Sequence, residues 1–357
     1  MTTRELSLSR RRPRRPSGPT RYGATRDVLA ELLAGEPRYR VDQVWEGLYV
    51  GLRSPDEMTN LPLRLRDDVG RLLPTELTPI AETVSDDGNT VKFLSALDGG
   101  FQVETVLMIY RDRATVCISS QAGCAMGCGF CATGQSGFDR HLSTGEIVEQ
   151  VVVAARRARV SGHRLSNVVF MGMGEPLANE AAVWAATQRI HDAIALSARH
   201  ITLSTVGVVP GIVALAGRQL PVTLAVSIHA ANDSLRDELV PLNRRYPLDA
   251  IVAACQQYLD AMGRRISFEW AMIDGVNDRP SDAVELAALA RRLRPAAHVN
   301  LIPLNPTPGW PTTGSPASRV RQFRDQLDTL GVSATVRRNR GTDIDAACGQ
   351  LAARHRT

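Results

Sequence analysis

Three of the six cysteines, Cys124, Cys128 and Cys131, lie within one glycine-rich loop. Glycine lets a backbone wrap closely around a compact group, and three thiolates from one loop can bind three irons of a four-iron cluster. The fourth iron then stays open to a substrate. Structural zinc, the alternative, usually takes four ligands, commonly from two Cys-x2-Cys pairs, and the sequence holds no second pair. The spacing therefore favours an iron–sulfur cluster over zinc.

A second group of residues has the donors and acceptors to hold a small polar ligand beside that cluster. They follow predicted strands, and each one singly could be a local cap or a tight turn. Together, at equivalent places in successive strands, they favour a ligand-binding site. The candidates are Gly174, Glu175, Ser204, Ser227, Ile228, His229 and Asn305.

The elements that position these residues follow a regular rhythm from residue 114 onward. Short β-branched runs occur at about 114–119, 166–171, 201–205, 222–228, 266–272, 298–303 and 332–337. Amphipathic helical stretches lie between most of them, for instance at 143–160, 181–196, 247–262, 281–293 and 316–330. This alternation indicates an α/β fold with a parallel sheet. Periodicity alone fits a doubly wound sheet or a barrel, but polar residues at successive strand ends favour a partial (βα)6-type barrel.

We divide the chain into five parts on composition and pattern. Residues 1–20 are expected to be a disordered basic tail, 21–84 a small helical accessory domain that docks RNA, and 85–113 a β connection. The core barrel then covers 114–343, and residues 344–357 form a C-terminal segment. Trp45 and Tyr49 lie four residues apart in the helical domain, a spacing more typical of core packing than of a stacking platform.

Hydropathy, charge and cysteine content indicate the cellular compartment and the class of partner that we expect. No apolar run is long enough to span a membrane, and no apolar segment follows the basic cluster at 10–16, so we expect a cytoplasmic protein without a signal peptide. In a reducing cytoplasm, clustered cysteines are metal-binding or catalytic rather than disulfide-bonded. The net charge of +5 permits a nucleic-acid partner. Only one cation is a lysine, Lys92, and the arginine bias fits either phosphate binding or a GC-rich genome.

The Cys-x3-Cys-x2-Cys spacing resembles the signature of the radical S-adenosylmethionine superfamily. That resemblance implies a [4Fe–4S] cluster on Cys124, Cys128 and Cys131, with S-adenosylmethionine bound to the open iron. It also implies a partial (βα) barrel, and a contact between the Gly174–Glu175 stretch and the methionine amino group.

A narrower resemblance is carried by residues 117–124, 225–233, 300–306 and 340–351, and extends over about 24–351. These stretches are similar to the RlmN/Cfr family of RNA adenine methyltransferases. One departure is Val206, where the family commonly has a second serine. The resemblance implies methylation of C2 of an adenosine in 23S rRNA, with tRNA as a hypothetical second substrate at the adenosine beside the anticodon. A flavodoxin or ferredoxin system is the implied electron donor.

The family resemblance also assigns catalytic roles. Cys348 is implied to accept a methyl group from one S-adenosylmethionine, while a second one supplies the radical that activates that group. Cys117 is then implied to release the product by forming a disulfide with Cys348, and Glu104 to take the proton from the modified carbon. Without the resemblance, Cys117 would be interpreted as a buried strand cysteine and Glu104 as a solvated strand residue.

Arginines near the C-terminal cysteine are candidates for RNA phosphate contacts, although a solvated basic terminus is the simpler interpretation. They are Arg337, Arg338 and Arg340, with Arg354 and Arg356 beyond Cys348. Three other functions stay open: a Cfr-like enzyme acting on C8 of the adenine, a radical activase for a partner protein, and a zinc-stabilised RNA-binding protein. An activase would not need Cys117 and Cys348 as a pair.

Overall fold

The computed structural model describes residues 2–5 and 18–352. In this part of the chain, an eleven-stranded mixed sheet has the order β1-β2-β3-β4-β5-β8-β9-β10-β11-β12-β13, and β6 pairs with β7 in a small second sheet. The strands are β1 (Thr2–Glu5), β2 (Thr78–Val84), β3 (Thr90–Ala96), β4 (Gln102–Ile109), β5 (Ala114–Cys117), β6 (Gln121–Gly123), β7 (Phe138–His141), β8 (Leu165–Phe170), β9 (Ile201–Thr205), β10 (Thr223–Ser227), β11 (Ser267–Met272), β12 (His298–Pro303) and β13 (Ala334–Val336).

In the large sheet, β5 and β8 to β13 pair in parallel, whereas β1 to β5 pair antiparallel. Each predicted β-branched run contains one of the parallel strands, and apolar residues along these strands are buried. Because β1 and β13 form opposite edges of the sheet and do not pair, the barrel stays open. The predicted partial barrel is therefore confirmed.

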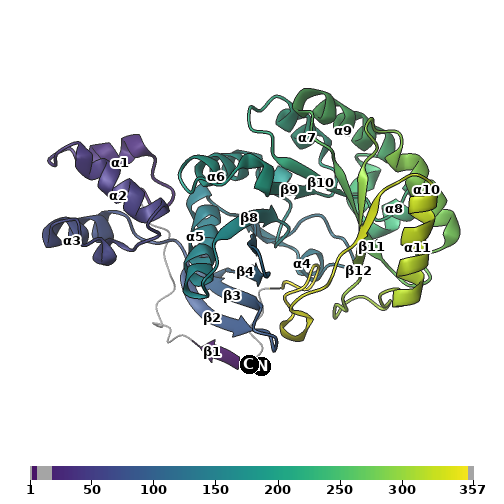
Figure 1. Cartoon of the computed structure of the whole chain (residues 1–357), viewed down its shortest axis with the longest axis horizontal. Helices are drawn as coiled ribbons and strands as arrows, with labels where there is room; N and C mark the ends of the chain where they lie inside the picture. Colours follow the sequence, from purple (N-terminus) through teal and green to yellow (C-terminus); the bar gives the residue numbers. More distant parts are fainter. Residues whose placement is uncertain (1, 6–17, 353–357) are drawn as a thin grey trace.

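Helices cover the outer face of the curved sheet, and the inner face is left for the cysteine loop and the C-terminal segment (Figure 1). The helices are α1 (Arg26–Leu32), α2 (Tyr39–Tyr49), α3 (Leu63–Leu72), α4 (Ala132–Gln135), α5 (Thr144–Val160), α6 (Glu180–Asp192), α7 (Val209–Ala216), α8 (Asp233–Leu239), α9 (Leu248–Met262), α10 (Pro280–Ala290) and α11 (Ala317–Thr329). α5 begins with a capping box in which Ser143 Oγ accepts from Glu146 N at 3.0 Å and Glu146 Oε2 accepts from Ser143 N at 2.8 Å.

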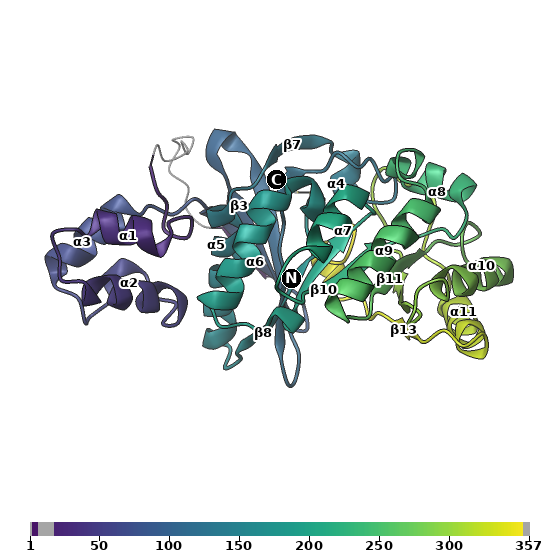
Figure 2. The ribbon, with the colours of Figure 1, turned by 90° about the horizontal axis from the view of Figure 1, so that it is seen from above.

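Helices α1 to α3 form a module at one end of the molecule, set apart from the barrel in Figure 2. Tyr49 is 1% exposed, and the Arg189 guanidinium on α6 lies 4.8 Å from the Trp45 ring centroid and donates to the Tyr49 hydroxyl at 2.7 Å. These two aromatic residues therefore pack the module against the barrel, as their spacing suggested, rather than presenting a stacking surface.

Two segments differ from the expected pattern. Thr2–Glu5, expected within the disordered tail, forms β1 along the otherwise open edge of β2, where unpaired backbone groups can accept another strand. β2 itself lies in the range expected to be helical. The basic cluster at 10–16, Arg354 and Arg356 lie outside the described residues. Among the residues that the structure describes, no helix is both long and apolar enough to cross a bilayer.

Candidate active site

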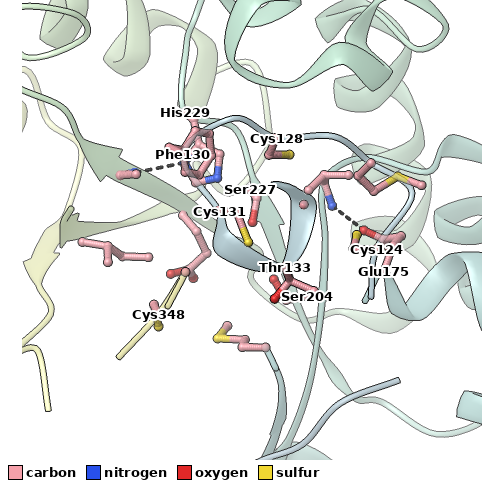
Figure 3. Close-up of a pocket in the computed structure, with 18 of the residues that line it drawn as sticks. Cys124, Cys128, Phe130, Cys131, Thr133, Glu175, Ser204, Ser227, His229 and Cys348 are labelled. Atoms are coloured by element: carbon pink, nitrogen blue, oxygen red, sulfur yellow. Dashed lines mark hydrogen bonds between the residues drawn. The ribbon is translucent and has the colours of Figure 1, made fainter. Parts of the chain in front are cut away.

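A cavity of about 990 Å³, measured with its open mouth, lies on the inner face of the sheet at the carboxyl ends of the parallel strands. Its walls include the three clustered cysteines, Glu175 and Cys348. In the view of Figure 3, Cys124 and Glu175 lie on one side and Cys348 on the other, with Cys131 between them. The cavity thus brings Cys348 together with a cysteine loop that lies more than 200 positions before it in the sequence.

The cysteine loop is held in a tight frame between β6 and β7. Cys124 N donates to Gly137 O at 2.7 Å, and Gly123 has a φ of +70°. A Cβ on Gly123 would lie 2.1 Å from Gly137 O, so the close approach of these two backbones requires glycine. Burial raises the pKa of the Cys124 thiol to about 12 and also raises that of Cys128.

The donor set fits an iron–sulfur cluster. Raised thiol pKa values describe the metal-free loop, and coordination to a metal deprotonates such thiols. Among the described residues, no three His, Cys, Asp or Glu side chains converge on a site the size of a single ion. The three cysteines instead line a larger cavity, which suits thiolates that bind separate irons of one cluster.

Glu175 is fixed in the cavity wall by backbone donors on two neighbouring strand ends. Its Oε1 accepts from Leu177 N and its Oε2 from Val206 N, both at 2.9 Å. Burial raises the pKa of this carboxyl to about 7, and the two backbone donors oppose that rise. Val206, which stands where the family commonly has a serine, therefore still contacts Glu175, because the contact uses its backbone N–H and not its side chain.

Gly174, Ser204, Ser227 and His229 also line the cavity, as the strand-end pattern predicted. His229 has a left-handed φ of +60°, and its Nδ1 accepts from Ala271 N at 3.0 Å. Since Nδ1 is an acceptor, the ring proton of the neutral form lies on Nε2. Burial lowers the pKa of His229 to about 3, so the ring is neutral at physiological pH.

Two of the predicted ligand residues lie outside the cavity wall. Ile228 is completely buried, and its carbonyl accepts from Arg236 Nε at 3.0 Å. Asn305 donates from Nδ2 to Cys348 O at 3.0 Å and accepts from Asn339 Nδ2 at 2.6 Å. In this structure Asn305 therefore positions the backbone of Cys348.

The segment that carries Cys348 crosses the open side of the barrel and contacts the cysteine loop. Ala132 N donates to Gly349 O at 2.8 Å, and Thr133 Oγ1 donates to Leu351 O at 2.6 Å. The Cys348 side chain is exposed to the cavity but surrounded by protein, and this desolvation raises the pKa of its thiol.

Cys117 lies at the end of β5, where it pairs with Val106 on β4 and Val169 on β8. It is 8% exposed and lies outside the cavity wall. Burial, and secondarily the neighbouring Cys348 thiol, raise its pKa well above the usual range. Cys117 and Cys348 are therefore close in space, with Cys117 behind Cys348 and outside the cavity wall.

Glu104 is buried on β4, contrary to a solvated strand position. Its Oε1 lies 3.0 Å from Lys92 Nζ, and its Oε2 accepts from Ala352 N at 2.9 Å. Lys92 also donates to Asp345 O at 3.3 Å. The single lysine of the chain thus joins Glu104 to the C-terminal segment, a contact that sequence analysis did not find. Its only signal was the isolated lysine in an arginine-rich chain.

The three arginines before Cys348 are in different settings. Arg337 and Arg338 are exposed. The Arg340 guanidinium instead lies 4.2 Å from the Tyr110 ring centroid and donates to Ile109 O at 3.2 Å. Arg340 therefore anchors the C-terminal segment to β4, whereas Arg337 and Arg338 face solvent.

Comparison with known proteins agrees with this geometry. The model of the radical SAM superfamily matches residues 118–287. The chain is 49% identical to a probable dual-specificity RNA methyltransferase RlmN from Chloroflexus aurantiacus, over 94% of this chain and 93% of that protein. It is 52% identical to a protein of the same name from Salinispora tropica, over 95% of both.

Among solved structures, a radical SAM methyltransferase from Sphaerobacter thermophilus superposes with a TM-score of 0.91 at 50% identity, covering 94% of this chain and 100% of that one. Radical SAM enzymes use a [4Fe–4S] cluster and S-adenosylmethionine. The chain belongs to the RlmN family of radical SAM RNA methyltransferases.

Proposed function

We propose that this enzyme methylates C2 of an adenosine at the peptidyl-transferase centre of 23S rRNA, and also the adenosine 3′ of the tRNA anticodon. The observation that carries the proposal is the placement of Cys348 in the same cavity as the cysteine loop, with Cys117 behind it. A cluster on three cysteines leaves these two thiols free for a methyl relay. The dual-specificity name of the relatives supports two RNA substrates.

In this proposal Cys124, Cys128 and Cys131 hold the cluster, and Gly174, Glu175, Ser204, Ser227 and His229 surround S-adenosylmethionine. The backbone of Ile228 and the side chain of Asn305 support that pocket from behind. When bound, the cluster and two molecules of S-adenosylmethionine per turnover supply one methyl group and the one-electron chemistry that activates it.

Three side chains, those of Cys348, Cys117 and Glu104, have separate roles in the remaining steps. Cys348 carries the methyl group, and its backbone contact with Asn305 aims the sulfur into the cavity. Cys117 attacks Cys348 Sγ, which breaks the bond from Sγ to the transferred carbon. That carbon takes up a proton to become the methyl group of the product, and a cellular thiol reductant reopens the Cys117–Cys348 disulfide. Glu104 takes the proton from the modified carbon. Oε2 accepts from Ala352 N and Oε1 pairs with Lys92, so these contacts hold the carboxylate in place for that role.

Substrate RNA and the reductant approach from the open side of the barrel. Exposed Arg337 and Arg338 lie near Cys348 in the sequence and are suited to bind phosphates, and an adenosine has to leave its stack to reach the cavity. A cytoplasmic flavodoxin or ferredoxin system supplies the electron.

The test is mass spectrometry of the Cys348 peptide together with nucleoside analysis of 23S rRNA and tRNA treated with the anaerobic holoenzyme. We expect one added methyl group on Cys348 and 2-methyladenosine in both RNAs, and neither product with Cys348→Ala. An unmodified Cys348 in active enzyme contradicts the relay. The appearance of 8-methyladenosine supports the Cfr-like alternative, and unmodified tRNA restricts the activity to rRNA.

Two further controls separate the remaining alternatives. Cys117→Ala is expected to abolish product release while leaving Cys348 methylated, whereas an activase would keep its activity. Metal analysis of anaerobically purified protein should find iron and sulfide, and zinc alone would support the RNA-binding alternative.

A further inference from the structure

Arg236 on α8 is a fully buried cation whose direct partners are all neutral. Its relative exposure is 0%. Nε donates to Ile228 O at 3.0 Å, and Nη1 donates to Asn243 Oδ1 at 2.7 Å. Nη2 donates to Val206 O at 2.7 Å and to Ser227 O at 3.1 Å. The guanidinium is therefore well hydrogen-bonded, but these contacts do not neutralise its charge.

The nearest acids, Asp233 and Asp237, favour the charged form of Arg236 only from beyond ion-pair distance. Asp233 and Asp237 accept from Asn243 Nδ2 at 3.0 and 2.6 Å, so an amide stands between them and the guanidinium. Among the described residues, no carboxylate lies within ion-pair distance of Arg236. Burial lowers the pKa of Arg236 to about 10, so it stays charged at neutral pH. A buried cation that no carboxylate contacts directly is costly, which indicates a further anionic partner.

The cysteine loop provides the place for that partner. Cys128 packs in one buried cluster with Leu239 and Val240, which follow Arg236 on the chain. The Arg236 charge also acts on the Cys128 thiol, where it opposes the larger effect of burial. A four-iron cluster held by three thiolates has a net negative charge, and one more electron increases it. A fixed cation beside it makes reduction easier, because net charge and hydrogen bonding set the potential of such clusters.

The same guanidinium joins two strand ends of the cofactor pocket. One carbonyl partner, Val206, directly follows β9, and the other, Ser227, is the last residue of β10. Ser227 and Ser204 of β9 both line the cavity. We propose that Arg236 is a positioning residue that holds these two strand ends and supplies the buried positive charge facing the iron–sulfur cluster, which makes the cluster easier to reduce. This inference rests on the proposed assignment of the cluster to Cys124, Cys128 and Cys131.

The experiment compares Arg236→Gln, which removes the charge, with Arg236→Lys, which keeps it but has fewer donors. Arg218→Gln is the matched control, since Arg218 is a half-buried arginine that pairs with Glu180 on α6, away from the cysteine loop. Iron and sulfide content and an electron paramagnetic resonance redox titration are measured on anaerobic holoprotein without RNA. We expect Arg236→Gln to shift the reduction equilibrium about tenfold toward the oxidised cluster, which is about 59 mV for one electron.

Arg236→Lys should stay close to the wild-type potential, and Arg218→Gln should be unchanged. If Arg236→Gln cannot retain its cluster while Arg236→Lys can, the need for charge is also supported. The proposal would be overturned if the wild type, Arg236→Gln and Arg236→Lys had equal reduction potentials. Equal loss of the cluster in both variants would also overturn it, because a purely structural role predicts no dependence on charge. Since no RNA is present, failure of the RNA assignment leaves this result unaffected. Wild-type protein without iron would instead overturn the cluster assignment itself.

Discussion

Glu149 on α5 offers a direct test of the electrostatics at the junction between the helical module and the barrel. The carboxyl is 4% exposed, and its Oε2 accepts from Glu76 N at 2.8 Å. Burial, with a smaller contribution from the Glu76 carboxylate, raises the pKa of Glu149 from 4.5 to about 8. The folded state therefore binds a proton here that the unfolded chain has already lost at neutral pH.

The sign of the pH effect follows from linkage. An acid whose pKa is raised on folding contributes most to stability below its unfolded pKa of 4.5, and that contribution is lost as the pH rises toward 8. At about 1.36 kcal/mol for each unit of pKa, the ceiling of this loss is about 5 kcal/mol. Relaxation of the junction and entry of water will reduce it to a few kcal/mol.

Glu149→Gln keeps an acceptor for Glu76 N but cannot ionise. We expect the variant to match the wild type at pH 5 and to exceed its thermal midpoint at pH 8.5 by several degrees, at roughly 2 °C for each kcal/mol. Glu82→Gln is the control, because Glu82 pairs with Arg157 in a half-buried position. Calorimetry or circular dichroism of anaerobic protein across this pH range measures the difference. If wild type and Glu149→Gln lose stability in parallel as the pH rises, the reasoning is refuted.

Three further perturbations test the site. Lys92→Met removes the cation that pairs with the buried Glu104 carboxylate. Loss of one partner of a buried pair costs about 3–5 kcal/mol, so thermal stability and the yield of methylated nucleoside should both fall. An unchanged thermal midpoint would contradict the burial of this pair. Gly123→Ala forces a Cβ into the neighbouring backbone and should lower the amount of bound iron severalfold. Gly137→Ala is the control, because a Cβ at Gly137 meets open space, and this variant should retain more iron. Equal iron content in both variants would remove the steric argument. In nuclear magnetic resonance spectra of iron-free protein with labelled histidine, the His229 resonances should not titrate between pH 5 and 8, because burial lowers the pKa of His229 to about 3. A titration midpoint near 6.5 would instead show a solvated ring.

The local parts of this candidate site could be proposed from the sequence because short-range chemistry determines them. The cysteine loop and the Gly174–Glu175 turn each lie within a few residues, and strand ends collect at one edge of any parallel sheet. The short helices α7 and α8 were not predicted, since seven or eight residues give too little periodicity to recognise. α6 ends at Asp192 rather than at 196, and Ala195 takes a left-handed φ of +59° beyond it.

Long-range contacts were beyond sequence reasoning for a physical reason. The bond from Ala352 N to Glu104 joins residues 248 positions apart, and its existence depends on where the C-terminal segment crosses the sheet. The same is true of Asn305, whose amide was expected in the cofactor pocket and instead binds the Cys348 carbonyl. Residue type and spacing identify which groups can react, whereas the packing of distant elements decides which groups support them.

The crossing of the C-terminal segment has a consequence for synthesis of the enzyme. The cysteine loop and its supporting strands β6 and β7 have emerged from the ribosome about 200 residues before Cys348. The wall that contains Cys348 forms only when the last described residues reach Thr133, Lys92 and Glu104, which makes it a contact of very high sequence separation. Cluster insertion can therefore precede closure of the cavity during translation, and Cys348 is the last of the cysteines to arrive.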